Sequence, residues 1–137
     1  MNSKEMAESY LIEGEIRLET ARTALDKGHF AYAVRQSQEC VELSLKGALR
    51  YLGIEPPKWH DVGIILRNEA QRFPDWFTES IDRITLISRE LRRERETSMY
   101  GDNELNLPPQ QLYTKLDALE AVRKADFVIG LCKRLVV

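Results

Sequence analysis

Two long stretches with the apolar spacing of helices, joined by a very short turn, fill the first 52 residues of the chain. The first stretch begins near Ser3, a suitable N-cap residue. Its small and apolar residues recur at alternating steps of four and three, which places them on one face of a helix. They are Ala7, Leu11, Gly14, Leu18, Ala21 and Leu25. Gly28 ends this helix and a second begins almost at once, so the pattern predicts an antiparallel helical hairpin.

The second helix is stopped by Gly53 and by the pair Pro56-Pro57. Its expected inward residues are Phe30, Ala33, Ser37, Cys40, Val41, Ser44, Ala48, Tyr51 and Leu52. After a loop, a short third helix is expected, with either Asp61 or His60 as its cap. Its inward residues are expected to be Val62, Ile65, Leu66 and Ala70.

A fourth helix is expected after the break at Phe73-Pro74-Asp75, with an inward stripe that ends on an arginine. The stripe consists of Phe77, Ile81, Ile84, Ser88, Leu91 and Arg95. Residues 101–113 read as a long loop, and the last helix runs from about Lys115 to the end of the chain. Its expected inward residues are Leu116, Leu119, Val122, Phe127, Leu131 and Leu135. With no convincing strand, the patterns predict one all-α domain, residues 1–137, folded as an up-down helical bundle of four to five helices.

The composition excludes several classes of protein. No apolar run approaches the roughly 18 residues of a membrane span, and no signal peptide is evident, so a cytoplasmic protein is expected. The net charge of −2 argues against gripping nucleic acid through bulk positive charge. Any RNA contact would need a local basic cluster, or two clusters joined by dimerisation. Cys40 and Cys132 have neither close spacing nor neighbouring histidines, so they are expected to be buried apolar residues rather than metal ligands.

The densest cluster of functional side chains is the run from Arg92 to Asp102, where a helix rich in arginine meets Tyr100 and Gly101. In one interpretation, Arg92, Arg93 and Arg95 bind phosphate through their guanidinium groups. In the other, they form a solvated helix end, paired locally with the glutamates at positions 90, 94 and 96. Tyr100 is open to two interpretations as well: an exposed surface for stacking a base, or a tyrosine packed at the turn.

Two segments resemble those of the HEPN domain family. One is residues 32–49, YAVRQSQECVELSLKGAL, with a Gln-x-x-Val-Glu-x-x-x-Lys pattern, and the other is the Pro-x-x-His-Asp loop at 57–61. The resemblance extends over most of the chain. It implies a homodimeric helical bundle, often encoded beside a small nucleotidyltransferase partner. Active members are metal-independent ribonucleases of toxin–antitoxin or defence systems, so neither a metal nor a cofactor is implied.

The family's nuclease motif is an Arg, four to six residues, and a His, and one branch adds a Tyr that accepts AMP from the partner enzyme. In this sequence Arg93 fits the Arg, Ser98 falls at the His, and Tyr100 fits the Tyr. A second alignment pairs Arg95 with Tyr100. Neither alignment supplies an imidazole, whose pKa of about 6.5 suits the removal of a 2′-hydroxyl proton, whereas tyrosine as a residue type titrates near 10.

Three hypotheses follow from this departure. The leading one is a binding module that engages a nucleotidyltransferase, a nucleotide or RNA with little nuclease activity, and in which Tyr100 is a candidate AMP acceptor. The second is a ribonuclease toxin that uses Arg93 and a substitute base, either Tyr100 or a histidine from elsewhere, His29 or His60. The third is a dimeric helical adaptor. Other residues have simpler explanations: Ser98 as an ordinary helix residue, Trp59 and Trp76 as core or interface residues, Glu39 and Lys46 as surface or dimer-rim residues.

Overall fold

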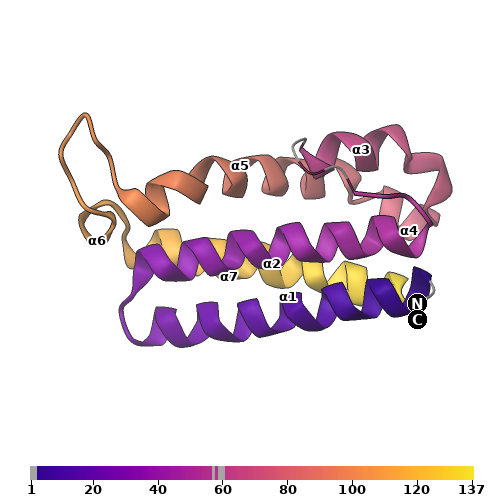
Figure 1. Cartoon of the computed structure of the whole chain (residues 1–137), viewed down its shortest axis with the longest axis horizontal. Helices are drawn as coiled ribbons and strands as arrows, with labels where there is room; N and C mark the ends of the chain where they lie inside the picture. Colours follow the sequence, from indigo (N-terminus) through magenta and orange to yellow (C-terminus); the bar gives the residue numbers. More distant parts are fainter. Residues whose placement is uncertain (1–2, 57, 59–60) are drawn as a thin grey trace.

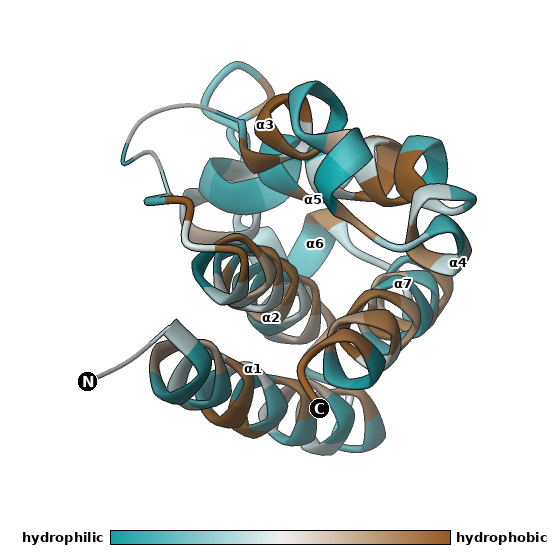
Figure 2. Ribbon diagram, turned by 90° about the vertical axis from the view of Figure 1, so that its right-hand side faces the viewer, coloured by the Kyte–Doolittle hydropathy of each residue, from teal (hydrophilic) through white to brown (hydrophobic). Residues whose placement is uncertain are grey.

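Four long helices form the body of the computed structural model, which describes residues 3–56, 58 and 61–137. They are α1 (Ser3–Asp26), α2 (Phe30–Tyr51), α5 (Ile81–Tyr100) and α7 (Lys115–Leu135). Each runs antiparallel to the one before it, and both ends of the chain lie at the same end of the bundle (Figure 1). Seen end-on, α2 lies between α1 and α5, with α7 beside it (Figure 2). The predicted all-α up-down bundle is confirmed.

Shorter helices connect the long ones. They are α3 (Val62–Asn68), a 3₁₀ turn (Ala70–Arg72), α4 (Asp75–Thr78) and α6 (Pro109–Leu112). The predicted fourth helix is therefore two helices, α4 and α5, and the predicted loop 101–113 contains α6. Of the two residues predicted as the cap of α3, Asp61 fills this role, because its Oδ1 accepts a hydrogen bond from the Gly63 amide at 2.9 Å. The competing interpretations of His60 concern a residue outside the described part of the chain.

Small residues let α1 and α2 pack closely along the hairpin. A methyl group added at Gly14 would lie 3.0 Å from the Ser44 hydroxyl oxygen, and one added at Gly47 would lie 3.1 Å from the Tyr10 side chain. Both distances are shorter than ordinary carbon contacts. The predicted antiparallel hairpin is thus stabilised by an approach of the two backbones that larger residues would prevent.

Two predicted inward positions are wrong. Leu116 is 61% exposed, and the buried face of α7 is instead built largely from Ala118, Ala121 and Ala125. Arg95 is exposed, and the buried stripe of α5 continues to Ser98. Leu116 lies in the first turn of α7, about 160° around the helix from Ala118 and so on the opposite face. Arg95 lies close to the buried side of α5, but its long charged side chain reaches solvent.

An aromatic cluster anchors the start of α4 against the end of α7. The rings of Phe73 and Phe77 stack with their centroids 4.5 Å apart, and Trp76 packs edge-on to Phe77. The Arg134 guanidinium lies 4.0 Å from the centroid of the Trp76 ring. Of the two interpretations of Trp76, packing within the bundle is the one observed, while Trp59 falls outside the described residues.

Both cysteines are fully buried, as expected. Burial raises the pKa of the Cys40 thiol to about 12, and burial also raises the pKa of Cys132. A thiolate is therefore strongly disfavoured at either position. Within the described part of the chain, no helix combines the length and the apolar character that crossing a bilayer requires.

Candidate functional site

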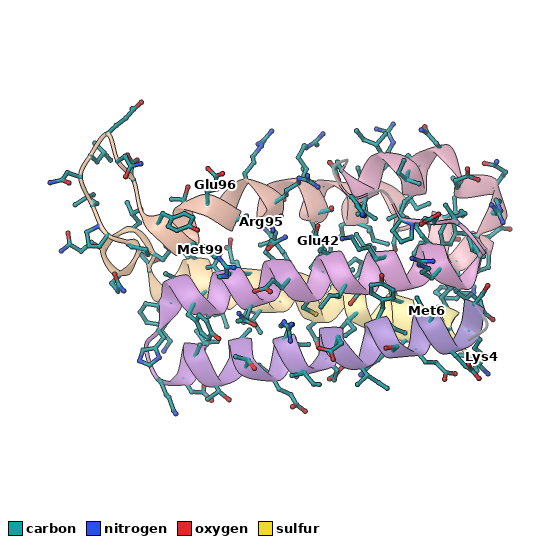
Figure 3. The ribbon with its side chains drawn as sticks, viewed as in Figure 1. Lys4, Met6, Glu42, Arg95, Glu96 and Met99 are labelled. Carbon is teal, nitrogen blue, oxygen red and sulfur yellow. The ribbon has the colours of Figure 1, made fainter. Side chains whose placement is uncertain are left out.

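The arginines of α5 lie on different sides of the helix. Arg93 and Tyr100 are seven residues apart, so at about 100° per residue they share one stripe on the outer face of α5. Arg95 and Met99 lie on the side of α5 that faces α2, with Glu96 pointing the opposite way (Figure 3). Arg93, Arg95 and Tyr100 are all exposed, Tyr100 to 70%. Arg95 lies about 160° around the helix axis from Arg93 and about 140° from Tyr100, so the pair of the first alignment shares a face of α5 and the pair of the second alignment does not.

Ser98, the residue at the position of the motif histidine, is not on either surface. It is only 5% exposed, and its hydroxyl donates a hydrogen bond to the Arg95 carbonyl oxygen at 3.3 Å. Five positions along a helix turn it about 140° away from Arg93. The structure therefore does not bring Ser98 together with Arg93 or Tyr100, and it supports the simpler interpretation of Ser98 as an ordinary helix residue.

Two of the three glutamates of this segment, Glu90 and Glu94, have partners on other elements. Glu90 pairs with Lys124 of α7 at 3.6 Å, and Glu94 accepts a hydrogen bond from the Tyr113 hydroxyl at 2.5 Å. Among the described residues, neither Arg93 nor Arg95 has an ion-pair partner. The expected local pairing with these glutamates is therefore not formed, and both guanidinium groups face solvent.

The hydrogen bond from Tyr113 holds the Glu94 carboxylate away from the arginines. Burial, together with the hydrogen bond to Glu94 and the negative charge of that carboxylate, raises the pKa of the Tyr113 phenol above its usual value. The phenol therefore remains a hydrogen-bond donor to Glu94 throughout the neutral range. This contact also ties the segment after α6 to the middle of the α5 surface.

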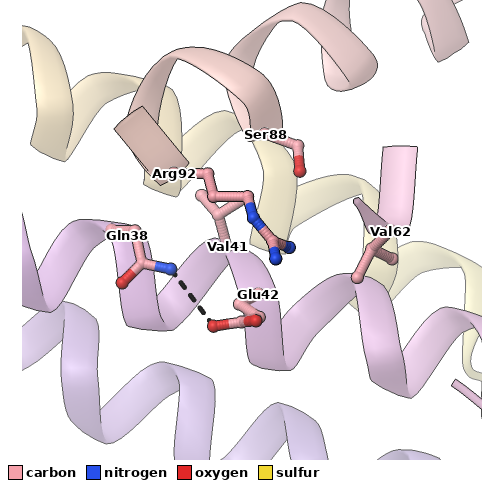
Figure 4. A pocket seen from close by; sticks show the side chains of 6 residues that line it. All are labelled: Gln38, Val41, Glu42, Val62, Ser88 and Arg92. Carbon is pink, nitrogen blue, oxygen red and sulfur yellow. Dashed lines mark hydrogen bonds between the residues drawn. The ribbon is translucent and has the colours of Figure 1, made fainter. Parts of the chain in front are cut away.

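Arg92 occupies a different environment, a small hollow between α2 and α5 (Figure 4). Its guanidinium is turned toward Glu42, which accepts a hydrogen bond from the Gln38 amide at 3.1 Å and pairs with Lys46 at 3.7 Å. The hollow measures about 10 Å³, enough for roughly one water molecule. Arg92 is thus half-buried, and the hollow beside it is too small for a substrate.

The polar cluster of Gln38, Glu42 and Arg92 was not predicted, although the spacing of residues on α2 indicates it. The spacing Gln38, Val41, Glu42 and Lys46 places four residues on one side of α2, where three of them line the hollow with Arg92. Gln38 is only 4% exposed. Lys46 and Glu39 are half-buried surface residues, and Glu39 pairs with Arg35 at 3.5 Å and Arg17 at 3.6 Å.

His29, one of the two histidines, lies on the turn between α1 and α2. It is exposed, and it lines a pocket with Gln110 of α6 rather than with any arginine of α5. Within the part of the chain that the structure describes, His29 is the one histidine, and no hydrogen bond joins it to Arg93 or Arg95. The described residues therefore offer no substitute base of this kind next to the arginines.

A hydrogen-bonded loop follows Tyr100 and projects from the end of the bundle (Figure 1). Asp102 and Leu107 exchange two backbone hydrogen bonds of 2.9 and 3.0 Å, and the Asp102 side chain accepts a third from the Leu105 amide. Gly101 starts the loop with a φ of 83°. We refer to residues 101–108 as the finger.

Comparison with known proteins agrees with this architecture. The chain superposes on the crystal structure of TT1696 from Thermus thermophilus with a TM-score of 0.76 and 24% identity, covering 98% of both chains. It superposes on ST0689, an archaeal HEPN homologue, with a TM-score of 0.73 and 27% identity, covering 96% of this chain and 98% of the other. A comparison with curated proteins finds no match. The model of the HEPN domain matches residues 7–135. The chain therefore belongs to the HEPN domain family.

Proposed function

We propose that this HEPN domain is a binding module that engages RNA or a nucleotide through Arg93, Arg95 and Tyr100, with little or no ribonuclease activity. The observation that carries the proposal is the pairing of Glu90 with Lys124 and of Glu94 with Tyr113. Both contacts leave the guanidinium groups of Arg93 and Arg95 exposed. Exposed guanidinium groups bind phosphate by paired hydrogen bonds, and an exposed tyrosine offers a ring on which a base stacks.

Cleavage of RNA without a metal needs a group that accepts the proton of the 2′-hydroxyl. General-base catalysis of this kind is typically worth 10²–10⁴-fold. Ser98 is buried, and serine is a very weak base. Tyrosine, the other residue type at the motif, titrates near 10 and is almost wholly protonated at neutral pH. Binding is therefore favoured over the rival proposal of a ribonuclease toxin that uses Arg93 and a substitute base.

Removing both exposed arginines tests the binding site. In the double variant Arg93→Ala/Arg95→Ala, we expect weaker binding to a mixed tRNA pool, and a slope of log K against log salt smaller in magnitude by roughly 1.5, because two phosphate contacts are lost. Fluorescence anisotropy at several salt concentrations measures both quantities. Arg123→Ala is the matched control. Arg123 is an exposed arginine of α7 that has no ion-pair partner among the described residues, so its removal should change neither the affinity nor the salt slope. Equal loss in the control would contradict this assignment.

We further propose that the module works as a homodimer. The net charge of −2 does not favour RNA binding by a single copy, whereas a dimer doubles the number of exposed arginines available to one strand. Light scattering at micromolar concentration should give twice the mass of one chain. A monomer mass at that concentration would refute the dimer.

Tyr100 is also the proposed AMP acceptor of a nucleotidyltransferase partner in a toxin–antitoxin pair. Its 70% exposure at the end of α5 makes the hydroxyl accessible to a second active site. Co-expression with an adjacently encoded nucleotidyltransferase should give a stable complex, and intact-mass analysis should show one adenylate per chain. Tyr100→Phe keeps the ring and removes the acceptor, so the added mass should disappear. Adenylate retained on Tyr100→Phe, or no complex with wild type, would count against this role.

A further inference from the structure

A second hollow, separate from the α5 surface, lies where the turn between α1 and α2 faces α6. It measures about 220 Å³ and is more enclosed than the two larger hollows beside α1. Its lining consists of Gly28, His29, Phe30, Ala31, Tyr32 and Gln110. This volume is below the range of drug-sized sites and suits a small ring system.

The lining favours a flat and uncharged ligand. Three of the lining side chains carry rings, those of His29, Phe30 and Tyr32, and no carboxylate, ammonium or guanidinium group lines the hollow among the described residues. Tyr32 is 48% exposed, so a face of its ring is accessible. His29 and Tyr32 also line the neighbouring, more open hollow on α1, which gives a ligand a route in from solvent. Flat rings stack on such surfaces whatever their substituents.

Gln110 supplies a polar side chain to the lining from α6. It is the second residue of α6, directly after Pro108-Pro109, whose rings fix the backbone that leads to it. No hydrogen bond of the Gln110 amide is found among the described residues. An amide offers one acceptor and two donors, which matches the donor–acceptor edge of a heteroaromatic ring.

We propose that this hollow binds a flat, uncharged heteroaromatic ring of one or two fused rings, stacked on Tyr32 and read along its edge by Gln110. A nucleoside and an indole compound are the two sources of such a ring, since both offer the same stacking face. The site is separate from Arg93 and Arg95, neither of which lines the hollow.

The test is an NMR titration of the full chain, followed through the His29 ring and the amides of residues 30–32. Adenosine, indole and ribose 5-phosphate are the three probes. We expect adenosine or indole to shift these signals with a Kd of roughly 1 mM or below, a value ordinary for about ten ligand atoms. Shifts from adenosine alone would identify a nucleoside, and shifts from indole alone an indole compound. Ribose 5-phosphate, which has no aromatic ring, should leave the signals unchanged.

Two variants connect any binding to the proposed contacts. Tyr32→Leu removes the stacking ring and should weaken binding by roughly 5- to 100-fold. Gln110→Ala should weaken adenosine binding by roughly 2- to 10-fold. Ile64→Ala, which removes an exposed apolar side chain of α3 outside the hollow, is the control and should not change the Kd. The proposal is overturned if neither ring probe shifts the signals, if Tyr32→Leu binds as wild type, or if ribose 5-phosphate alone gives the same shifts.

Discussion

Replacing Gly101 with alanine is expected to open the finger. Gly101 has φ 83° and ψ −164°, a region that only glycine adopts without strain. In addition, an added methyl carbon would lie 2.2 Å from the Leu107 carbonyl oxygen and 3.0 Å from the Pro108 Cα, so backbone must move. We expect the closed loop of this variant to be strained by about 2–4 kcal/mol, which exceeds the stabilisation that the two hydrogen bonds between Asp102 and Leu107 provide. Amide hydrogen exchange of Asp102 and Leu107 should therefore accelerate.

Gly130→Ala provides the matched control for this change. Gly130 is an exposed residue within α7, and nothing lies within 4 Å of a methyl group added there. Alanine is the better helix former, so this variant should stabilise the protein by about 0.5–1 kcal/mol. Unchanged protection of the Asp102 and Leu107 amides in Gly101→Ala would contradict the requirement for glycine at position 101.

Introducing the motif histidine at position 98 is expected to damage the fold. Ser98 is 5% exposed, and an imidazole is much larger than the serine side chain it would replace. Burying the ring would also remove its polar nitrogens from water. We expect Ser98→His to lower the free energy of unfolding by about 1–3 kcal/mol, measured by urea titration. A variant as stable as wild type that also cleaves RNA in EDTA would show that position 98 does reach the RNA.

Tyr100→His tests the same chemistry at an accessible position. Tyr100 is 70% exposed, so the exchange should alter stability by no more than about 0.5 kcal/mol. It follows Arg93 after six residues, within the spacing of the family motif, and on the same stripe of α5. If RNA bound by the arginines also passes position 100, this variant should gain cleavage in EDTA that Arg93→Ala abolishes. Comparison of Ser98→His with Tyr100→His thus shows whether a histidine variant fails to cleave RNA because it is unfolded or because its imidazole does not reach the RNA.

The long helices could be predicted because each signal was local. Apolar spacing located four helices, and Gly28 and Gly53, both with φ near 80°, mark where two of them end. The buried face of the last helix was harder to predict, because alanines at 118, 121 and 125 fill it. The large apolar residue Leu116, which was predicted to be buried, is exposed. Small residues signal close packing of helices only when the neighbouring helix is known.

The candidate site was predictable only in part. The arginine cluster is visible in the sequence. Whether the neighbouring glutamates pair with the arginines depends on Lys124 and Tyr113, which lie far along the chain. The burial of Ser98 likewise follows from how α5 packs on the bundle. Side-chain partners distant in sequence decide both points, and periodicity carries no information about them.

The measurement that most directly tests the central claim is recovery of RNA from its complex with the wild-type protein. A labelled tRNA pool would be titrated with protein in EDTA, and the same samples would then be separated on a denaturing gel. We predict bound RNA that is recovered intact, with binding reduced in Arg93→Ala/Arg95→Ala. Cleaved RNA that depends on Arg93 or Arg95 would contradict this prediction and would identify the protein as a ribonuclease.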